Sequence, residues 1–238
     1  MKRNPQPQSL RLDRLLSQAS GLSRSQVKGI VISGLVQVDG AVVRDAGFSV
    51  RATQQVLLDG EAVEWPRERY VMLHKPVGYV CSTDEPGHPL VADLIDAPWA
   101  QRLHSAGRLD VDSTGLVLLT SDGQWSHALT STRRGCVKTY RVQVKHPLDA
   151  SLKQRFADGV VLRDEAKPTL PAVLDLLDSH TARVRISEGR YHQVKRMFAA
   201  CGNRVEALHR EAIGNLALDP QLQPGEWREL TPHEAANV

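Results

Sequence analysis

Residues 104–123 read HSAGRLDVDSTGLVLLTSDG, and this stretch joins an aspartate-rich loop to an apolar run at 116–119. The run is typical of a buried strand, and Arg108, Asp110 and Asp112 stand directly before it. Four kinds of site concentrate carboxylates in this way: a calcium loop, an aspartyl-phosphate phosphatase, a glycoside hydrolase with paired carboxylates, and a site where one aspartate acts on an anionic ligand. The structural alternative is a turn with Asx and Ser/Thr hydrogen bonds before the strand.

Spacing disfavours three of these four sites. A calcium loop that starts at Asp110 places Ser121 at position 12, where calcium requires a bidentate carboxylate. The phosphatase nucleophile ends a buried strand, whereas here the apolar strand follows the aspartates. Asp110 and Asp112 would lie about 7 Å apart on one face of an extended segment, as in an inverting glycosidase, but Arg108 favours an ionised Asp110 over a proton donor. Of the four kinds of site, the one with a single aspartate held ionised by a cation remains. The structural alternative, a turn before the strand, also remains.

Length and composition indicate a soluble globular protein of one or two domains. The 238 residues are 41% hydrophobic and 24% charged, and no apolar run approaches the roughly 18 residues that a membrane span needs. The start, MKRNPQPQ, lacks the apolar core of a signal peptide, so we expect residues 1–8 to form a disordered tail. Cys81, Cys136 and Cys201 form no C-x-x-C pair, which disfavours disulfides or a zinc site and fits a cytoplasmic protein without a bound metal.

Residues 9–60 predict two short helices and a hairpin. Gly21 ends the first helix, and Ser23 with Gln26 forms a capping box that opens the second. Asp39-Gly40 marks the hairpin turn. The first helix has an apolar face at helical spacing, formed by Leu12, Leu15, Leu16 and Ala19.

This N-terminal module is basic. Residues 1–51 contain eight Lys or Arg against three Asp, a net charge of +5, and because the whole chain carries +3 the remainder carries −2. Such a module predicts an anionic polymer as partner, and its candidate phosphate ligands are Arg11, Arg14, Arg24 and Lys28. The pattern RLDxxL…SRSxxxxxIxxGxVxVxG, over about residues 9–57, resembles the S4 RNA-binding domain, which implies single-stranded or structured RNA as the partner.

The residues after position 60 indicate a second, α+β domain over 70–238, joined by a charged, proline-interrupted linker over 61–69. Strands are predicted at 71–73, 79–81, 115–120, 139–144, 182–187, 204–209 and 215–218. Helices are predicted at 88–94, 125–129, 151–156 and 192–201. Strands in succession with interspersed helices indicate a mixed, largely antiparallel sheet with flanking helices.

A second group of cations lies in ISEGRYHQVKRMFAACGNRVEALHR, residues 186–210. The helix in this segment buries an apolar face formed by Val194, Met197, Phe198 and Cys201. The basic side chains are Arg190, His192, Lys195, Arg196, Arg204, His209 and Arg210. A solvated basic helix is one interpretation, but the cations continue beyond the helix, which favours a cleft that faces RNA. The predicted RNA-binding residues are Arg190, His192, Arg196 and Arg210.

Three segments resemble the signature regions of the RsuA-type pseudouridine synthases: GRLDVDSTGLVLLTSDG, KTYRV and EGRYHQVKRMF…LHREAIG. The resemblance runs from about residue 9 nearly to the C-terminus. His74 stands where the family has asparagine in its NKPxG turn, a departure that affects a structural turn. The resemblance implies an S4 domain followed by a catalytic domain that converts uridine to pseudouridine within RNA, without a cofactor or a metal.

The resemblance also implies roles for single residues. Asp110 is the catalytic carboxylate, which either attacks C1′ or removes the C2′ proton. Arg108 or Lys195 holds it ionised, Tyr140 stacks on the uracil and Leu208 walls the pocket. The implied substrate is 16S rRNA, with uridine 516 as the target, bound as a ribonucleoprotein assembly intermediate. The enzyme is expected to act as a monomer.

Two other classes of function stay open at this point. A catalytically silent S4-type factor would bind RNA without isomerising it. A nucleoside hydrolase or a phosphatase would release free base or phosphate. Within the favoured class, a large-subunit rRNA target is the main alternative.

Overall fold

The computed structural model describes residues 9–82 and 87–238, and the chain divides into two compact units. One contains the described residues up to Glu68 together with Asp96–Leu103, and the other contains Arg69–Ile95 and His104–Val238. The segment Asp96–Leu103 therefore belongs to the N-terminal unit, a grouping that the expected domain boundaries do not include. The disordered tail expected over residues 1–8 lies outside the described residues.

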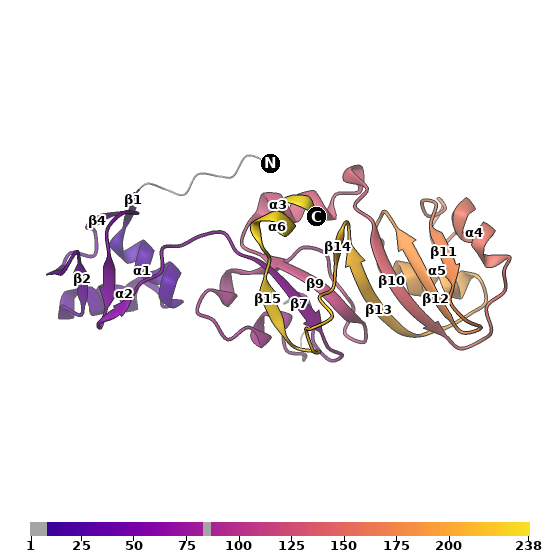
Figure 1. The fold of residues 1–238 in the computed structure, drawn as a ribbon, viewed down its shortest axis with the longest axis horizontal. Helices are drawn as coiled ribbons and strands as arrows, with labels where there is room; N and C mark the ends of the chain where they lie inside the picture. Colours follow the sequence, from indigo (N-terminus) through magenta and orange to yellow (C-terminus); the bar gives the residue numbers. More distant parts are fainter. Residues whose placement is uncertain (1–8, 83–86) are drawn as a thin grey trace. The chain divides into compact units, whose positions relative to one another are not determined.

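The N-terminal unit opens with two helices between short strands (Figure 1). Its elements are β1 (Ser9–Arg11), α1 (Leu12–Ser20), α2 (Arg24–Ser33), β2 (Val36–Val38), β3 (Ala41–Val42), β4 (Ser49–Arg51), β5 (Val56–Leu58), β6 (Glu61–Ala62) and the 3-10 turn η2 (Ala100–Arg102). β1 pairs with β4, and a second sheet has the order β3-β2-β5-β6. β6 lies where the linker is expected, because the turn at Asp59 and Gly60, both with positive φ, folds it back onto β5.

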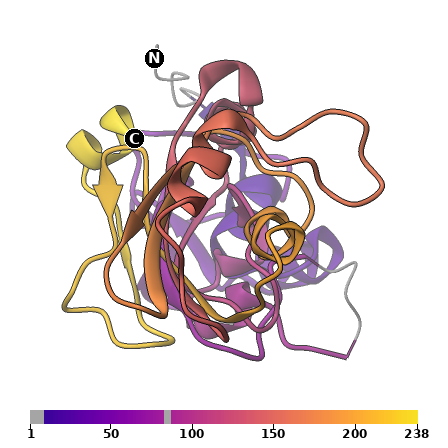
Figure 2. The ribbon, with the colours of Figure 1, turned by 90° about the vertical axis from the view of Figure 1, so that its right-hand side faces the viewer.

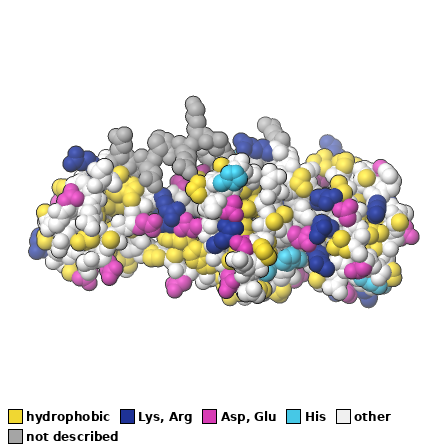
Figure 3. All heavy atoms as spheres, viewed as in Figure 1, with side chains coloured by type: hydrophobic (Ala, Val, Ile, Leu, Met, Phe, Trp, Pro, Cys, Tyr) yellow, Lys and Arg dark blue, Asp and Glu magenta, His cyan; other side chains and the backbone are white. Residues whose placement is uncertain are grey.

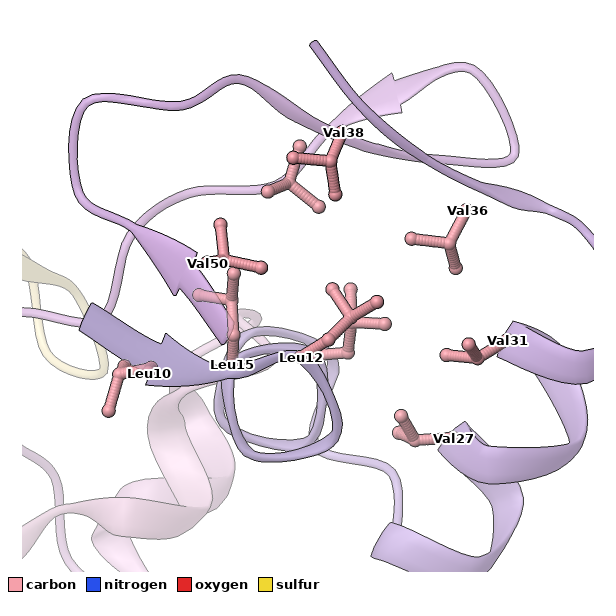
Figure 4. Close-up of a cluster of buried hydrophobic side chains, with 10 residues drawn as sticks. Leu10, Leu12, Leu15, Val27, Val31, Val36, Val38 and Val50 are labelled. Atoms are coloured by element: carbon pink, nitrogen blue, oxygen red, sulfur yellow. The ribbon is translucent and has the colours of Figure 1, made fainter. Parts of the chain in front are cut away.

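Local signals explain the two helices. Gln26 N donates to Ser23 Oγ at 3.4 Å, and Ser23 N donates to Gln26 Oε1 at 2.9 Å, so the predicted capping box is confirmed. Gly21 and Gly34 end the helices with φ of 73° and 86°. The apolar faces of both helices meet the strand valines in one core, which Figure 4 shows around Leu12, Leu15, Val27, Val31, Val36 and Val50.

The second unit contains most of the strands. Its elements are β7 (Tyr70–Lys75), η1 (Val91–Leu94), β8 (His104–Ser105), β9 (Thr114–Thr120), α3 (Gly123–Thr130), η3 (Thr132–Arg134), β10 (Lys138–Val144), α4 (Leu152–Asp158), β11 (Val173–Leu176), β12 (Thr181–Ile186), α5 (Gln193–Ala200), β13 (Val205–Ile213), β14 (Leu216–Ala217), β15 (Trp227–Glu229) and α6 (Pro232–Asn237). Residues 79–81, expected as a strand, contribute only an isolated bridge between Val80 and Leu90. The helix expected at 88–94 is the single 3-10 turn η1.

A nine-stranded mixed sheet organises this unit (Figure 1). The strand order is β11-β12-β10-β13-β9-β7-β15, with β14 paired to β13 and β8 paired to β9. β13 and β9 run parallel, and the other pairs among the described strands of this sheet are antiparallel. The predicted fold class, α+β with a mixed and largely antiparallel sheet, is therefore confirmed.

The two faces of this sheet differ in burial. In β10, Tyr140, Val142 and Val144 are buried, whereas Arg141 and Gln143 point to solvent. Helices α4 and α5 lie on the same side of the strands (Figure 2). They pack together through Phe156 and Phe198, whose ring centroids are 5.0 Å apart.

The surface of this unit in Figure 3 mixes Lys and Arg with Asp and Glu. Two of the ion pairs involve arginines of β12, Arg183 with Glu211 and Arg185 with Asp175.

Gly115 allows β9 to approach β13 at their parallel junction. Its φ is +106°, and a Cβ there would lie 2.6 Å from the backbone N of Arg210 and even closer to the Arg210 carbonyl oxygen. We therefore expect Gly115→Ala to lower the free energy of unfolding by roughly 3 kcal/mol, because backbone cannot yield as a flexible side chain does. Urea denaturation measures this loss. Gly123→Ala is the control, since its Cβ would meet nothing within 4 Å; equal losses in both variants would contradict the prediction.

Candidate active site

Asp110 lies in the loop 107–113, which leads directly into β9. The register between β9 and β13 pairs Thr114 with His209 and Gly115 with Arg210, so the loop ends beside the middle of β13. Thr114 Oγ1 and His209 Nδ1 are 2.9 Å apart. Burial, and then the charge of His74, lowers the pKa of His209. This shift favours the neutral form of His209.

Arg210 is part of the protein interior, at 2% exposure, and it binds the loop rather than a ligand. Its Nε donates to the carbonyl of Leu116 at 2.7 Å, Nη1 to Arg108 at 3.2 Å and Nη2 to Gly107 at 3.0 Å. All three guanidinium nitrogens thus bond to main-chain oxygens. This geometry contradicts the RNA-binding role expected of Arg210, because an enclosed side chain cannot reach a phosphate; its contacts are those of a residue that positions the loop.

Lys75, which the sequence analysis did not single out, holds the same loop from β7. Its side chain is fully buried, and Nζ donates to the carbonyls of Pro76 at 3.0 Å, Val111 at 3.4 Å and Ser113 at 2.7 Å. A buried ammonium needs such partners, because an uncompensated charge is costly away from water. The available signal was a lysine at the end of an apolar strand, directly before a proline turn. Arg210 and Lys75 together bind the main chain on both sides of Asp110.

Lys195 is the cation that contacts the Asp110 carboxylate. Its Nζ lies 2.8 Å from Asp110 Oδ2 and 2.6 Å from Asp112 Oδ1, and His192 Nε2 lies 3.4 Å from Asp110 Oδ1. Of the two cations that the sequence offered for Asp110, Lys195 is therefore the one in contact with it. Arg108 is exposed, and within residues 9–82 and 87–238 its side chain makes no ion pair with Asp110.

Lys195 and Asp112 stabilise each other's charged forms. Partial burial lowers the pKa of Lys195, but the hydrogen bonds to Asp110 and Asp112 outweigh it and the pKa is raised overall. Partial burial likewise raises the pKa of Asp112, but Lys195 outweighs it and the pKa falls below its usual value. Asp110 is the more enclosed of the two carboxylates, with its side chain 25% exposed against 63% for Asp112.

Tyr140 and Leu208 lie beside Arg210 on neighbouring strands. Tyr140 pairs with Arg210 in the β10–β13 register and Leu208 pairs with Val142, so their side chains share one face of the sheet. Each is 8% exposed, and Arg210 Cζ lies 6.0 Å from the centroid of the Tyr140 ring. The fold thus connects both side chains to the Asp110 loop through Arg210.

Arg190 and Arg196 bind another loop of the protein. Arg190 pairs with Glu165 at 2.5 Å and Glu188 at 3.2 Å, and it also donates to the carbonyls of residues 167 and 168. Arg196 pairs with Glu165 at 2.6 Å and donates to the carbonyl of Arg163 at 2.8 Å. In this structure their donors bind the segment between α4 and β11, and the phosphate contacts expected of Arg190 and Arg196 stay a prediction.

The cations of the N-terminal unit are exposed. Arg11 pairs with Asp13 at 3.2 Å. Arg14, Arg24 and Lys28 lie on the surfaces of α1 and α2, and Arg24 and Lys28 stand one helical turn apart. Their charges are available to an anionic polymer.

The part of the chain that the structure describes contains neither a metal site nor a membrane-spanning helix. No group of three or more His, Cys, Asp or Glu side chains there has the geometry to hold a metal ion. Of the described helices, none combines the length and the apolar character needed to cross a bilayer.

Comparison with known proteins identifies the class to which this site belongs. Residues 69–200 match the family described as RNA pseudouridylate synthase, and residues 10–63 match the S4 domain. The chain therefore belongs to the RNA pseudouridylate synthase family, with an S4 domain in front of its catalytic domain.

Individual relatives cover nearly the whole chain. It is 52% identical over 230 residues to the ribosomal small subunit pseudouridine synthase A of Yersinia pestis, which covers 96% of this chain and 98% of that protein. It is 50% identical to the protein of the same name from Escherichia coli (strain K12), over 96% and 100% of the two chains. A crystal structure of a pseudouridylate synthase has a TM-score of 0.70 at 45% identity and covers 96% of this chain and 99% of its own.

Proposed function

We propose that this pseudouridine synthase isomerises uridine 516 of 16S rRNA and that Asp110 is its catalytic carboxylate. The choice of RNA is supported by the near full-length identity of about 50% to small-subunit enzymes. The observation that carries the choice of residue is the bonding around Asp110, in which two buried cations hold the loop and Lys195 neutralises the carboxylate.

The reaction breaks the C1′–N1 bond, turns the uracil over and joins C5 to C1′. C5 loses a proton and N1 gains one, so atoms and electrons balance without an oxidant, a reductant or a transferred group. Asp110 acts either by attack on C1′ or by removal of the C2′ proton, and both roles require the ionised form. The Lys195 ammonium pairs with that carboxylate, with Nζ 2.8 Å from Oδ2.

The neighbours of Asp110 have supporting roles in this proposal. Tyr140 stacks on the uracil and Leu208 forms part of the apolar wall around it. His192 approaches the second oxygen of the carboxylate at 3.4 Å. The target uridine must leave its stack, at a cost of a few kcal/mol, so an rRNA segment not yet folded into the subunit is the favoured substrate. We propose a ribonucleoprotein assembly intermediate as that substrate and a monomer as the active form.

Mapping the product tests the proposal directly. Purified protein is incubated with unmodified 16S rRNA, both naked and partly assembled with small-subunit proteins, and pseudouridine is located by carbodiimide treatment and primer extension. We expect one new stop, at position 516. A stop only in large-subunit rRNA would contradict the choice of substrate. Release of free uracil would indicate a hydrolase, and RNA binding without any stop would indicate a silent binding factor.

The S4 domain should supply affinity rather than chemistry. We expect Arg24→Ala/Lys28→Ala to weaken binding and to reduce the slope of log affinity against log salt by roughly one to two units, because fewer counterions are released. The rate at saturating enzyme should change little. Single-turnover kinetics on a 16S fragment at several salt concentrations measures both quantities.

The control for that experiment removes two exposed cations from the other unit, as Lys153→Ala/Arg155→Ala on α4. We expect a smaller change in its salt slope. A large loss of rate at saturating enzyme, with an unchanged slope in the S4 variant, would show that the S4 domain positions the target uridine instead of only binding RNA.

A further inference from the structure

Tyr191 presents an aromatic ring to solvent beside the proposed catalytic carboxylate. At 74% exposure it is the most exposed large hydrophobic side chain of the described residues. Its ring stacks on His192, with centroids 3.7 Å apart and planes inclined by 22°. The other face of the Tyr191 ring is open. Proteins commonly recognise single-stranded RNA by stacking its bases on such aromatic rings.

The backbone holds this ring pair in place. Consecutive side chains of an extended chain point to opposite sides, so the stacking of Tyr191 on His192 requires a turn. His192 provides it with a φ of 49°, an uncommon conformation for a residue other than glycine. Arg196 donates to the Tyr191 carbonyl at 3.2 Å, and Arg190 N donates to Gln193 Oε1 at 2.9 Å. Uncommon backbone conformations that the surrounding contacts hold in place cluster at functional sites.

The distance from Asp110 decides which base can occupy the open face. His192 Nε2 lies 3.4 Å from Asp110 Oδ1, and the Tyr191 ring stacks on a face of His192 with the centroids 3.7 Å apart. A base in contact with the outer face of Tyr191 adds about another 3.5–4 Å, so it lies two ring layers outside His192. The uracil that reacts must keep its C1′ at Asp110. The open face therefore suits a nucleotide next to the target and not the target itself.

We propose that Tyr191, supported by His192, is a stacking platform for the base of a nucleotide adjacent to the target uridine. This inference rests on the proposed function, because it requires an RNA substrate that reacts at Asp110. A uridine that leaves its stack exposes the neighbouring base, and the tyrosine ring restores one stacking contact. Stacking of a base on an aromatic side chain corresponds to about a 5- to 150-fold change in affinity on alanine substitution.

Single-turnover kinetics of Tyr191→Ala and Tyr191→Phe, on a 16S fragment that the wild-type protein modifies, tests the platform. We expect Tyr191→Ala to raise the enzyme concentration for half-maximal rate by about 5- to 150-fold, with little change in maximal rate. Tyr191→Phe should behave as wild type, because it keeps the ring. Val161→Ala, a truncation at an exposed apolar residue on another loop, is the control and should change neither value.

Substrates with an abasic site 5′ or 3′ of the target identify the stacked base. At one of these positions the abasic site should raise the enzyme concentration for half-maximal rate of the wild-type protein by the same factor as Tyr191→Ala does. The abasic site should not raise this concentration further for Tyr191→Ala. A 2-aminopurine at that position should be quenched when wild type binds and much less when Tyr191→Ala binds. These readouts would not move if Tyr191 only maintained the fold.

Two failures are distinguishable. If wild type forms no pseudouridine in any rRNA, the proposed function fails. If wild type forms pseudouridine and Tyr191→Ala has the same half-maximal enzyme concentration, the platform is overturned while the proposed function stands. The same holds if, at both abasic positions, the effect of Tyr191→Ala multiplies with the effect of the abasic site.

Discussion

Asp110→Asn should lower the single-turnover rate of pseudouridine formation by at least about 10³-fold, because the amide keeps the shape of the side chain and removes its charge. RNA binding and the fold should persist. Lys195 still has Asp112 as a partner at 2.6 Å, so the substitution leaves no unpaired ammonium. The rate is measured at saturating enzyme, and binding is measured separately by filter retention.

Asp112→Asn is the matched control, because it changes a carboxylate that binds the same lysine. Its side chain is more exposed than that of Asp110, and Lys195 keeps its 2.8 Å contact with Asp110 in this variant. We expect a loss of less than about 10-fold, as for a nearby charge that does not react. Substantial activity in Asp110→Asn, or an equal loss in Asp112→Asn, would assign the chemistry to another group.

Arg210→Met should lower the free energy of unfolding by about 3 kcal/mol, because three main-chain carbonyls lose a charged donor inside the protein. Two of these carbonyls, those of Gly107 and Arg108, belong to the loop that carries Asp110. We therefore also expect the maximal rate to fall on the order of 10²-fold at a temperature where the variant remains folded, since small displacements of a reacting group have effects of that size.

Arg141→Met is the control for stability. Arg141 of β10 lies opposite His209 of β13, one position along from the Tyr140–Arg210 pair, but its side chain is exposed. Its effect should stay within about 0.5 kcal/mol. Arg210→Lys keeps the charge with one nitrogen in place of three, and should lie between wild type and Arg210→Met. Urea denaturation gives the stabilities. An Arg210→Met protein that is as stable as wild type but fails to bind RNA would restore the original expectation of a phosphate contact.

Features with a local cause could be predicted from the chain alone. The capping box at Ser23 and Gln26 depends on residues three apart, and the helix ends at Gly21 and Gly34 depend on single positions that adopt positive φ. The alternation in β10 follows from the two-residue period of a strand. Other local features were predicted less well. Residues 79–81 were expected as a strand but form a single bridge, and β15 and α6 were not predicted, although Thr231 and Glu234 form a capping box at the start of α6.

The family resemblance placed Asp110, Tyr140, Lys195 and Leu208 in a common site without saying how their side chains meet. The sequence left Asp110 with two possible cations, Arg108 two residues away and Lys195 far along the chain. Proximity in sequence favoured neither; Arg108 is exposed, and α5 brings Lys195 to the carboxylate.

By itself, the sequence determined the two-domain organisation, the α+β class, the basic S4 helices and the family, because these follow from composition, local period and short motifs. Only the tertiary structure decided which cations are exposed and which are buried and bonded within the protein. Lys195 meets Asp112 across 83 residues, Arg210 meets Leu116 across 94 and Lys75 meets Ser113 across 38. A cation has the same letter in the sequence whether it is solvated or buried, and its role depends on strand register and burial, which arise only when distant segments pack.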